Sequence, residues 1–227
     1  MARVTRRVTK LAALIPAAGD GLRLGRGPKA LVGVEGETLL NRAVRAFVGA
    51  VDEILVAVSP AMLVSITKGL EPPPGVRLVL GGETRQESVY NLLCETTAEI
   101  VLVHDAARPF LSRRVIADVI AAVETHEAAS VVTAVADTLL EAETGRVIDR
   151  GTLRAVQTPQ GFRRDIILAA HNQARRSGYA ATDDADLVRA SGHEVALVAG
   201  SSWLMKVTTA TDLELAEALA AVWDKKC

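Results

Sequence analysis

The chain has 227 residues, which fits a single domain, residues 1–227, whose core needs no disulfide or metal to hold it together. A formal net charge of -1 and only 3% aromatic residues argue against nucleic acid or an anionic membrane as partners. Cys94 and Cys227 form no metal or redox motif, so a reducing, cytoplasmic setting is expected.

The N-terminal ten residues are basic and contain Arg6-Arg7, which is one feature of an export signal. The apolar run that follows, Leu11–Ile15, is short and continues into a glycine-rich turn that cleavage would separate from its strand. We therefore favour a retained N-terminus over export. No segment has the length of a membrane-spanning helix.

Short apolar runs alternate with helical patterns as far as residue 136, which predicts a mostly parallel sheet covered by helices on both faces. Strands are expected at Leu11–Ile15, Ile54–Val58, Val76–Leu80, Ile100–His104 and Ser130–Ala136. Helices are expected at Thr38–Val48, Met62–Leu70, Arg85–Cys94 and Arg113–Thr125.

The helical periodicity stops between Asp137 and Gln160. A turn at residues 143–145 separates two short extended runs, which predicts a protruding β-arm over residues 137–160. Such an arm needs a partner surface to be stable. Beyond it, the pattern predicts helices at Arg163–Arg176, Asp184–Ala190 and Thr211–Trp223, and strands at Glu194–Val198 and Leu204–Val207.

The first strand-to-helix turn contains Gly19, Gly21 and Gly25. Glycines let backbone N–H groups approach phosphate oxygens closely, and Arg23 and Lys29 add two cations. The spacing fits neither a dinucleotide fingerprint, because Leu24 holds the third glycine position, nor a Walker A loop, because Pro28 precedes the lysine. We favour phosphate binding over a tight turn with two solvated charges.

The turn after Val76–Leu80 begins with Gly81-Gly82, which allows close approach to a planar base or ribose. Ser88 can hydrogen-bond a base edge. The alternative is a purely structural turn, in which Thr84 caps the next helix and Glu87 completes a capping box.

Asp105 follows the strand Ile100–His104 and precedes two alanines, which leaves room for Mg²⁺ and its waters. The alternative is an aspartate that satisfies loop N–H groups, with Arg108 as its ion-pair partner. His104 is interpreted as a packed residue and not as a base. Lys206 lies in an apolar run, where a lysine is costly unless it meets an anion, although an edge-strand lysine would look the same.

Together these segments resemble the 2-C-methyl-D-erythritol 4-phosphate cytidylyltransferase family of the non-mevalonate isoprenoid pathway, from Leu11 to Ala220. The matching motifs are Pro16-Ala-Ala-Gly19, Arg23, Pro28-Lys29, Gly81-Gly82, Arg85, Ser88-Val89, Val103-His-Asp-Ala-Ala-Arg-Pro109, Thr158-Pro159-Gln160, Thr182-Asp183-Asp184 and Lys206-Val207-Thr208. The resemblance implies a Rossmann-like three-layer α/β/α nucleotidyltransferase fold. It also implies direct in-line attack of a sugar-alcohol phosphate on the α-phosphate of CTP, with release of pyrophosphate.

The resemblance assigns roles residue by residue. Catalysis falls to Arg23, Lys29, Arg150 and Lys206, and magnesium to Asp105. Nucleotide contacts fall to Ala17, Ala18, Gly19, Gly21, Gly82, Glu83 and Ser88, and contacts with the second substrate to Arg108, Thr138, Arg150 and Thr158. In the family the arm crosses to a second subunit, so a homodimer is expected in which Thr138, Arg150 and Thr158 serve the partner's site.

Three positions depart from the family pattern: Glu83 replaces a frequent Asp, the loop from Leu24 to Pro28 is short, and Ala30 replaces a frequent Gln. The nearest alternative function is a ribitol 5-phosphate cytidylyltransferase. A uridylyl- or thymidylyltransferase, an NAD-dependent enzyme and a nucleotide-binding regulator without turnover are further candidates. The joint presence of Arg23, Lys29, Asp105 and Lys206 favours an enzyme.

Overall fold

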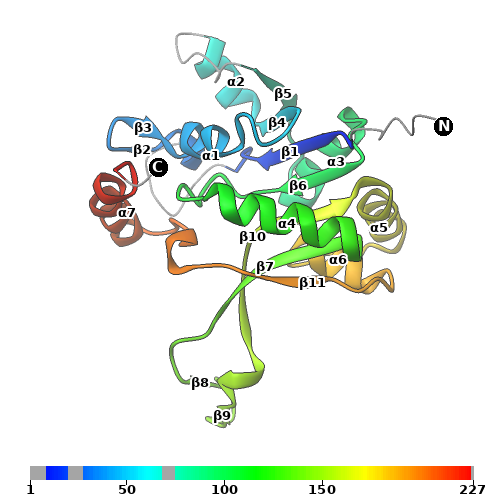
Figure 1. Cartoon of the computed structure of the whole chain (residues 1–227), viewed down its shortest axis with the longest axis vertical. Coiled ribbons are helices and arrows are strands. Elements are labelled where there is room, and N and C mark those ends of the chain that lie inside the picture. The colour runs from blue at the N-terminus through cyan, green and yellow to red at the C-terminus, as the bar shows by residue number, and fades with distance from the viewer. Residues whose placement is uncertain (1–8, 20–27, 68–74, 226–227) are drawn as a thin grey trace, which may run out of the picture.

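The computed structural model describes residues 9–19, 28–67 and 75–225, with side chains omitted for 65–67. Its centre is a seven-stranded sheet of order β11-β7-β10-β6-β1-β4-β5 (Figure 1). The strands are β1 (Leu11–Pro16), β4 (Glu53–Val58), β5 (Val76–Leu80), β6 (Ile100–Val103), β7 (Ala128–Ala134), β10 (Arg154–Arg163) and β11 (Ala196–Ala199). Every pairing is parallel except those of β10, which runs antiparallel between β6 and β7. The predicted mostly parallel sheet is confirmed.

Helices cover both faces of this sheet, as the alternating pattern predicts. One face packs against α1 (Leu39–Phe47), α2 (Pro60–Thr67) and α4 (Arg113–His126). The other face packs against α3 (Arg85–Glu95), α5 (Arg164–Ser177) and α6 (Asp184–Ala190). Strand β1 shows the reason, since Ala13 and Ile15 enter the first core while Ala12 and Leu14 enter the second.

A third, smaller core lies beneath the segments that carry Lys29 and Lys206. Helix α7 (Ala210–Trp223) packs there on Val32, Phe110 and Val207. The same region holds the short elements η2 (Lys29–Leu31), β2 (Gly33–Val34) and β3 (Glu37–Thr38). Packing against α7 therefore helps to hold the two segments that carry Lys29 and Lys206 in place relative to each other.

Strand β10 differs most from expectation, because the predicted arm of residues 137–160 includes part of a central strand. Residues 154–160 belong to β10, and the protruding part contains β8 (Leu139–Leu140), β9 (Val147–Ile148) and the turn η3 (Arg150–Thr152) (Figure 1). Polar residues conceal this strand in the sequence. Gln160 is fully buried, and hydrogen bonds compensate for the burial of its amide. The amide donates to Ser130 Oγ at 3.2 Å and accepts from the N–H of Ala185 at 3.0 Å.

The predicted strand Leu204–Val207 is wrong. Ser202–Leu204 forms a 3-10 turn, η4, and the following residues run to α7 without pairing with any strand in the described parts of the chain. Leu204 and Val207 are buried in different cores, and the N–H of Val207 donates to the Ala107 carbonyl at 2.9 Å. The apolar residues of this segment are therefore buried on two sides of a loop, and they do not form a strand.

The strand Val76–Leu80 and the helix Asp184–Ala190 have the predicted bounds, and the other predicted elements differ at their ends. The helix predicted over Met62–Leu70 begins at Pro60, and its predicted end lies outside the described residues. Within the residues that the structure describes, no helix combines the length and apolarity that a bilayer span requires.

Candidate active site

A cavity of about 220 Å³ opens at the carboxyl ends of β1, β5 and β6, where open α/β sheets bind ligands. The predicted residues that line it are Ala17, Ala18, Gly19, Lys29, Gly82, Glu83, Ser88, Asp105 and Lys206. The structure therefore brings together three turns and a lysine that are widely separated in the sequence.

The described structure does not place every predicted site residue in this cavity. Gly21 and Arg23 lie outside the described residues. Thr138 and Arg150 are exposed on the hairpin that contains β8 and β9, and neither lines the cavity. Arg150 donates to the Ala136 carbonyl at the base of this hairpin.

The glycine turn after β5 is pressed against the turn after β1. A Cβ atom on Gly81 would lie 2.4 Å from the Cβ of Ala18, so this approach requires glycine. Ser88 Oγ accepts from the N–H of Gly82 at 3.1 Å and donates to the Thr84 carbonyl at 3.0 Å. The hydroxyl of Ser88 thus holds the turn in place through hydrogen bonds to the backbone of the same chain.

The structural interpretation of this turn is confirmed, because Thr84 and Glu87 form a complete capping box at the start of α3. The same Glu87 carboxylate accepts from the N–H of Glu83 at 2.8 Å. The carboxylate of Glu87 is therefore engaged with the backbone, while Glu83 is exposed at the cavity.

Asp105 lies between two cations. Its Oδ1 accepts from Arg85 Nε at 3.1 Å and its Oδ2 from Lys206 Nζ at 2.7 Å. Burial opposes ionisation, but the charges of Arg85 and Lys206 outweigh it and hold the pKa of Asp105 well below its ordinary value. The group is a carboxylate throughout the physiological range.

The backbone of Asp105 is fixed from below by His104 and Thr158. Thr158 Oγ1 accepts from the N–H of Asp105 at 3.1 Å and lies 3.0 Å from His104 Nδ1. His104 Nε2 lies 3.1 Å from the Arg108 carbonyl, which only accepts, so Nε2 carries the proton and Nδ1 accepts from Thr158. Burial lowers the pKa of His104 to about 4. His104 is a packed residue, as predicted.

Arg108 is buried behind the same loop and is not an ion-pair partner of Asp105 in the described structure. Its guanidinium donates to the carbonyls of Leu204 and Val156, while its buried Nε has no acceptor among the described residues. The arginine therefore ties the Asp105 loop to β10 and to the segment that leads to Lys206.

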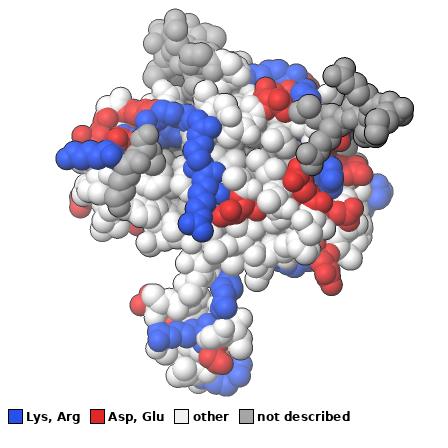
Figure 2. All heavy atoms as spheres, viewed as in Figure 1, with Lys and Arg blue, Asp and Glu red and all other residues white. Residues whose placement is uncertain are grey.

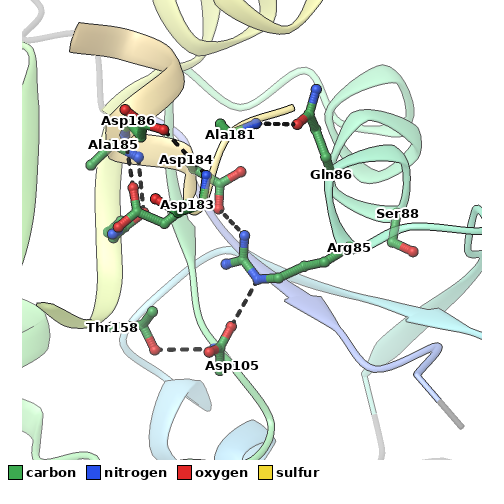
Figure 3. Close-up of polar contacts among 12 residues, drawn as sticks. Arg85, Gln86, Ser88, Asp105, Thr158, Ala181, Asp183, Asp184, Ala185 and Asp186 are labelled. Carbon is green, nitrogen blue, oxygen red and sulfur yellow. Dashed lines mark hydrogen bonds and ion pairs between the residues drawn. The ribbon is translucent and has the colours of Figure 1, made fainter. Parts of the chain in front are cut away.

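Arg85 and Asp184 have no predicted role, although both lie in the matching motifs. Arg85 reaches from the start of α3 to Asp105 and also donates from Nη1 to Asp184 Oδ2 at 2.7 Å (Figure 3). Burial lowers the pKa of Arg85, but the two carboxylates outweigh it and raise the pKa above its ordinary value. No sequence spacing signals this pair, because 99 residues separate its members.

The buried carboxylate of Asp105 in the cavity wall fits Mg²⁺, which takes one or two carboxylates and completes its shell with phosphates and water. It does not fit a closed site made of protein ligands. In the described parts of the chain, no group of three or more His, Cys, Asp or Glu residues is placed to hold a metal ion.

A three-layer α/β fold with a glycine turn, two lysines and a buried carboxylate at its strand ends is that of a nucleotidyltransferase. Residues 11–221 match the family model of 2-C-methyl-D-erythritol 4-phosphate cytidylyltransferase. The chain belongs to this family.

Several relatives agree with this assignment. The 2-C-methyl-D-erythritol 4-phosphate cytidylyltransferase of Deinococcus radiodurans is 52% identical over 92% of this chain and 89% of its own. That of Thermus thermophilus is 50% identical over 94% of this chain and 99% of its own. The crystal structure of the enzyme from Thermus thermophilus gives a TM-score of 0.82 at 46% identity and covers 93% of this chain and 99% of that one.

Proposed function

We propose that this chain joins CTP to 2-C-methyl-D-erythritol 4-phosphate to give 4-(CDP)-2-C-methyl-D-erythritol and pyrophosphate. Membership of the family over residues 11–221 supports this function. The observation that carries it is the meeting of Lys29, Asp105 and Lys206 at one cavity beside the Gly81-Gly82 turn. The high identity to named cytidylyltransferases disfavours the ribitol 5-phosphate alternative.

The reaction needs no covalent enzyme intermediate. A phosphate oxygen of the acceptor attacks the α-phosphorus of CTP, and the bond to the pyrophosphate oxygen breaks. A phosphate monoester is largely a dianion at neutral pH, so the nucleophile needs no general base. The chain's contribution is to position the two substrates and to stabilise the developing negative charge.

Lys29 and Lys206 supply that charge within the described residues, and we assign Arg23 to the same task. Lys206 is paired with Asp105 at 2.7 Å, yet its side chain is 42% exposed. An incoming phosphate therefore competes with Asp105 for the ammonium group. We therefore expect Lys206 to exchange Asp105 for a substrate phosphate when the substrates bind.

Mg²⁺ at this site would supply positive charge that offsets the charge of the substrate phosphates. Asp105 would hold it. Thr158 fixes the backbone of Asp105. The lowered pKa of Asp105 keeps its side chain ionised, so that it can bind a cation.

The cytidine would lie against the Gly81-Gly82 turn and the turn after β1, where Ala17, Ala18, Gly19 and Gly82 line the cavity. Glu83 and Ser88 complete this wall, and we assign Gly21 to the same loop. Gly81 brings the two turns together, so a planar base meets backbone on both sides.

We further propose a homodimer in which the hairpin of one subunit completes the other subunit's pocket. Thr138 and Arg150 are exposed on this hairpin, as are Leu140 (57%) and Val147 (64%). Figure 2 shows Lys and Arg side chains on the hairpin, and Figure 1 shows it extending away from the sheet. Such a surface suits contact with a phosphate-bearing pocket of a second copy.

Thr158 and Arg108, unlike Thr138 and Arg150, are not assigned to the partner's pocket. Thr158 binds the backbone of its own chain's Asp105, and Arg108 lies behind the same loop. We therefore assign both to the pocket of their own chain. The free, exposed Cys94 also agrees with a reducing cytoplasm as the proposed location.

The test is pyrophosphate release with Mg²⁺ and CTP, with 2-C-methyl-D-erythritol 4-phosphate or ribitol 5-phosphate as acceptor. We expect turnover with the first and at most weak turnover with the second. UTP and TTP in place of CTP test the uridylyl- and thymidylyltransferase candidates. Turnover only with ribitol 5-phosphate would move the acceptor assignment, and CTP binding without turnover would favour the regulator.

A further inference from the structure

Asp184 is buried behind the proposed metal ligand and takes no part in the proposed reaction. Its side chain is 1% exposed and does not line the cavity. It nevertheless contacts Arg85, which does line the cavity and touches Asp105 (Figure 3). A buried carboxylate is costly unless it is paired, so its position needs an explanation.

Arg85 spans the two carboxylates with different nitrogens. Its Nε lies 3.1 Å from Asp105 Oδ1, while its Nη1 lies 2.7 Å from Asp184 Oδ2. The guanidinium therefore gives its outer, shorter hydrogen bond to Asp184. Asp184 anchors the guanidinium at its outer end, and Lys206 Nζ holds the other Asp105 oxygen at 2.7 Å. Arg85 therefore gives Asp105 one hydrogen bond in place of the two-pronged pair that arginine favours with a single carboxylate.

Asp184 is held firmly from its own side. Its Oδ1 lies 3.3 Å from Nε2 of the buried His171 on α5. Asp183 caps α6 through the N–H of Asp186, and the N–H of Ala185 donates to Gln160 Oε1. The carboxylate of Asp184 is therefore fixed in place by two helices and a central strand.

We propose that Asp184 is a positioning residue that keeps Arg85 from closing on Asp105. A cation that fully paired with Asp105 would compete with a divalent metal for the same oxygens. With its outer nitrogen on Asp184, Arg85 makes only the 3.1 Å hydrogen bond to Asp105 Oδ1, which a metal ion displaces more easily than a two-pronged pair. The other oxygen is released when an incoming phosphate draws Lys206 away. This inference rests on the proposed use of Asp105 as the metal ligand.

Replacing Asp184 and replacing Arg85 are expected to have different effects on metal binding. Asp184→Asn removes the competing charge, so Arg85 moves toward Asp105 and metal binding weakens, by about tenfold if it acts like other residues behind a metal ligand. Arg85→Gln removes the competing cation itself, so metal binding does not weaken. The double variant Arg85→Gln/Asp184→Asn binds metal as Arg85→Gln does. A merely structural pair would weaken binding in all three variants.

The experiment measures Mn²⁺ affinity by water-proton relaxation on the full chain, with CTP and without acceptor, so that no turnover occurs. Mn²⁺ serves as the probe because, like Mg²⁺, it prefers oxygen ligands. Asp224→Asn is the matched control, since Asp224 pairs with Arg42 at 2.9 and 3.0 Å and does not line the cavity. It should leave Mn²⁺ affinity unchanged. Thermal melting of each variant reports on folding separately.

Unchanged Mn²⁺ affinity in Asp184→Asn, or equal weakening in Arg85→Gln, would overturn the proposal and leave the proposed function standing. A wild-type chain that binds no Mn²⁺ with CTP would overturn both. If Asp184→Asn is unfolded, Arg85→Gln and the double variant decide. The double variant leaves neither of the two charges unpaired, and weaker binding in it than in the wild type would contradict the inference.

Discussion

At the scale of single residues, the proposed chemistry can be tested most directly at Lys206. Replacing it with alanine removes a cation beside the reacting phosphates while the loop remains held by Val207. We expect kcat to fall by roughly two to three powers of ten, as for one lost transition-state donor. Steady-state pyrophosphate release measures it.

A matched control for this substitution is Lys10→Ala. Lys10 has a similar exposure, 44%, and also makes one ion pair, to Glu53 at 3.4 Å, but it lies before β1, at the opposite end of the strand from the cavity. Its replacement should leave kcat unchanged. Equal losses in both variants would contradict the role of Lys206.

The buried His104 predicts how stability depends on pH. Its pKa is lowered from 6.5 to about 4, so below pH 6.5 the unfolded chain takes up a proton that the folded chain does not. The free energy of unfolding therefore falls as pH drops from 6.5 to about 4, by up to about 3 kcal/mol at about 1.4 kcal/mol per pH unit. Chemical denaturation at several pH values measures this slope.

The variant His104→Gln should flatten that slope, since glutamine does not titrate. An unchanged slope would mean that other groups cause the acid sensitivity. Asp105 acts in a separate window, because its lowered pKa stabilises the fold above about pH 3.8 and this contribution is lost below it.

At the scale of elements, Gly161 decides how closely α4 approaches the sheet. A Cβ atom there would lie 2.6 Å from Val119 Cγ1 and 2.7 Å from Val123 Cγ2, and β10 is held by a strand on each side. Gly161→Ala must push α4 outward, so we expect a loss of about 1–3 kcal/mol. Urea unfolding of this variant gives the value.

Gly33→Ala is the comparison for this substitution. Gly33 lies in an exposed position on β2, and a Cβ atom there would meet nothing within 4 Å. Its effect should stay within about 0.5 kcal/mol. If the two alanine variants were equally stable, the close packing of α4 on β10 would not matter energetically.

At the scale of the whole molecule, the proposed dimer makes a prediction about mixed subunits. Arg150→Ala damages the hairpin and Lys206→Ala damages the pocket, so each variant alone should be nearly inactive. If the hairpin serves the partner's pocket, a mixed dimer contains one intact site. Remixing the two variants in equal amounts should then restore about a quarter of wild-type activity.

A mixture of Lys29→Ala with Lys206→Ala is the control, because both defects lie in the same cavity and no mixed dimer has an intact site. It should recover nothing. Failure of the first mixture to gain activity, or a monomer by light scattering at micromolar concentration, would contradict the shared site.

Several residues that line the cavity as predicted stand at the end of an apolar run. Ala18, Gly82 and Asp105 follow strands, and the carboxyl ends of parallel strands meet at one edge. The sequence left two interpretations of Lys206 open, a cation that meets an anion and an edge-strand lysine. Lys206 meets Asp105, and the strand predicted around it is absent from the described residues.

The alternation of apolar runs and helical patterns was enough to determine a mostly parallel, doubly covered sheet, because burial on both faces selects continuous Val, Ile and Leu runs. Motif order was enough to indicate the family. Three-dimensional packing decided the rest. It placed polar β10 at the centre, where Gln160 is satisfied by Ser130 and Ala185, and it brought Asp184 to Arg85 across 99 residues. Such contacts leave no periodic signal, since each depends on partners supplied by distant segments.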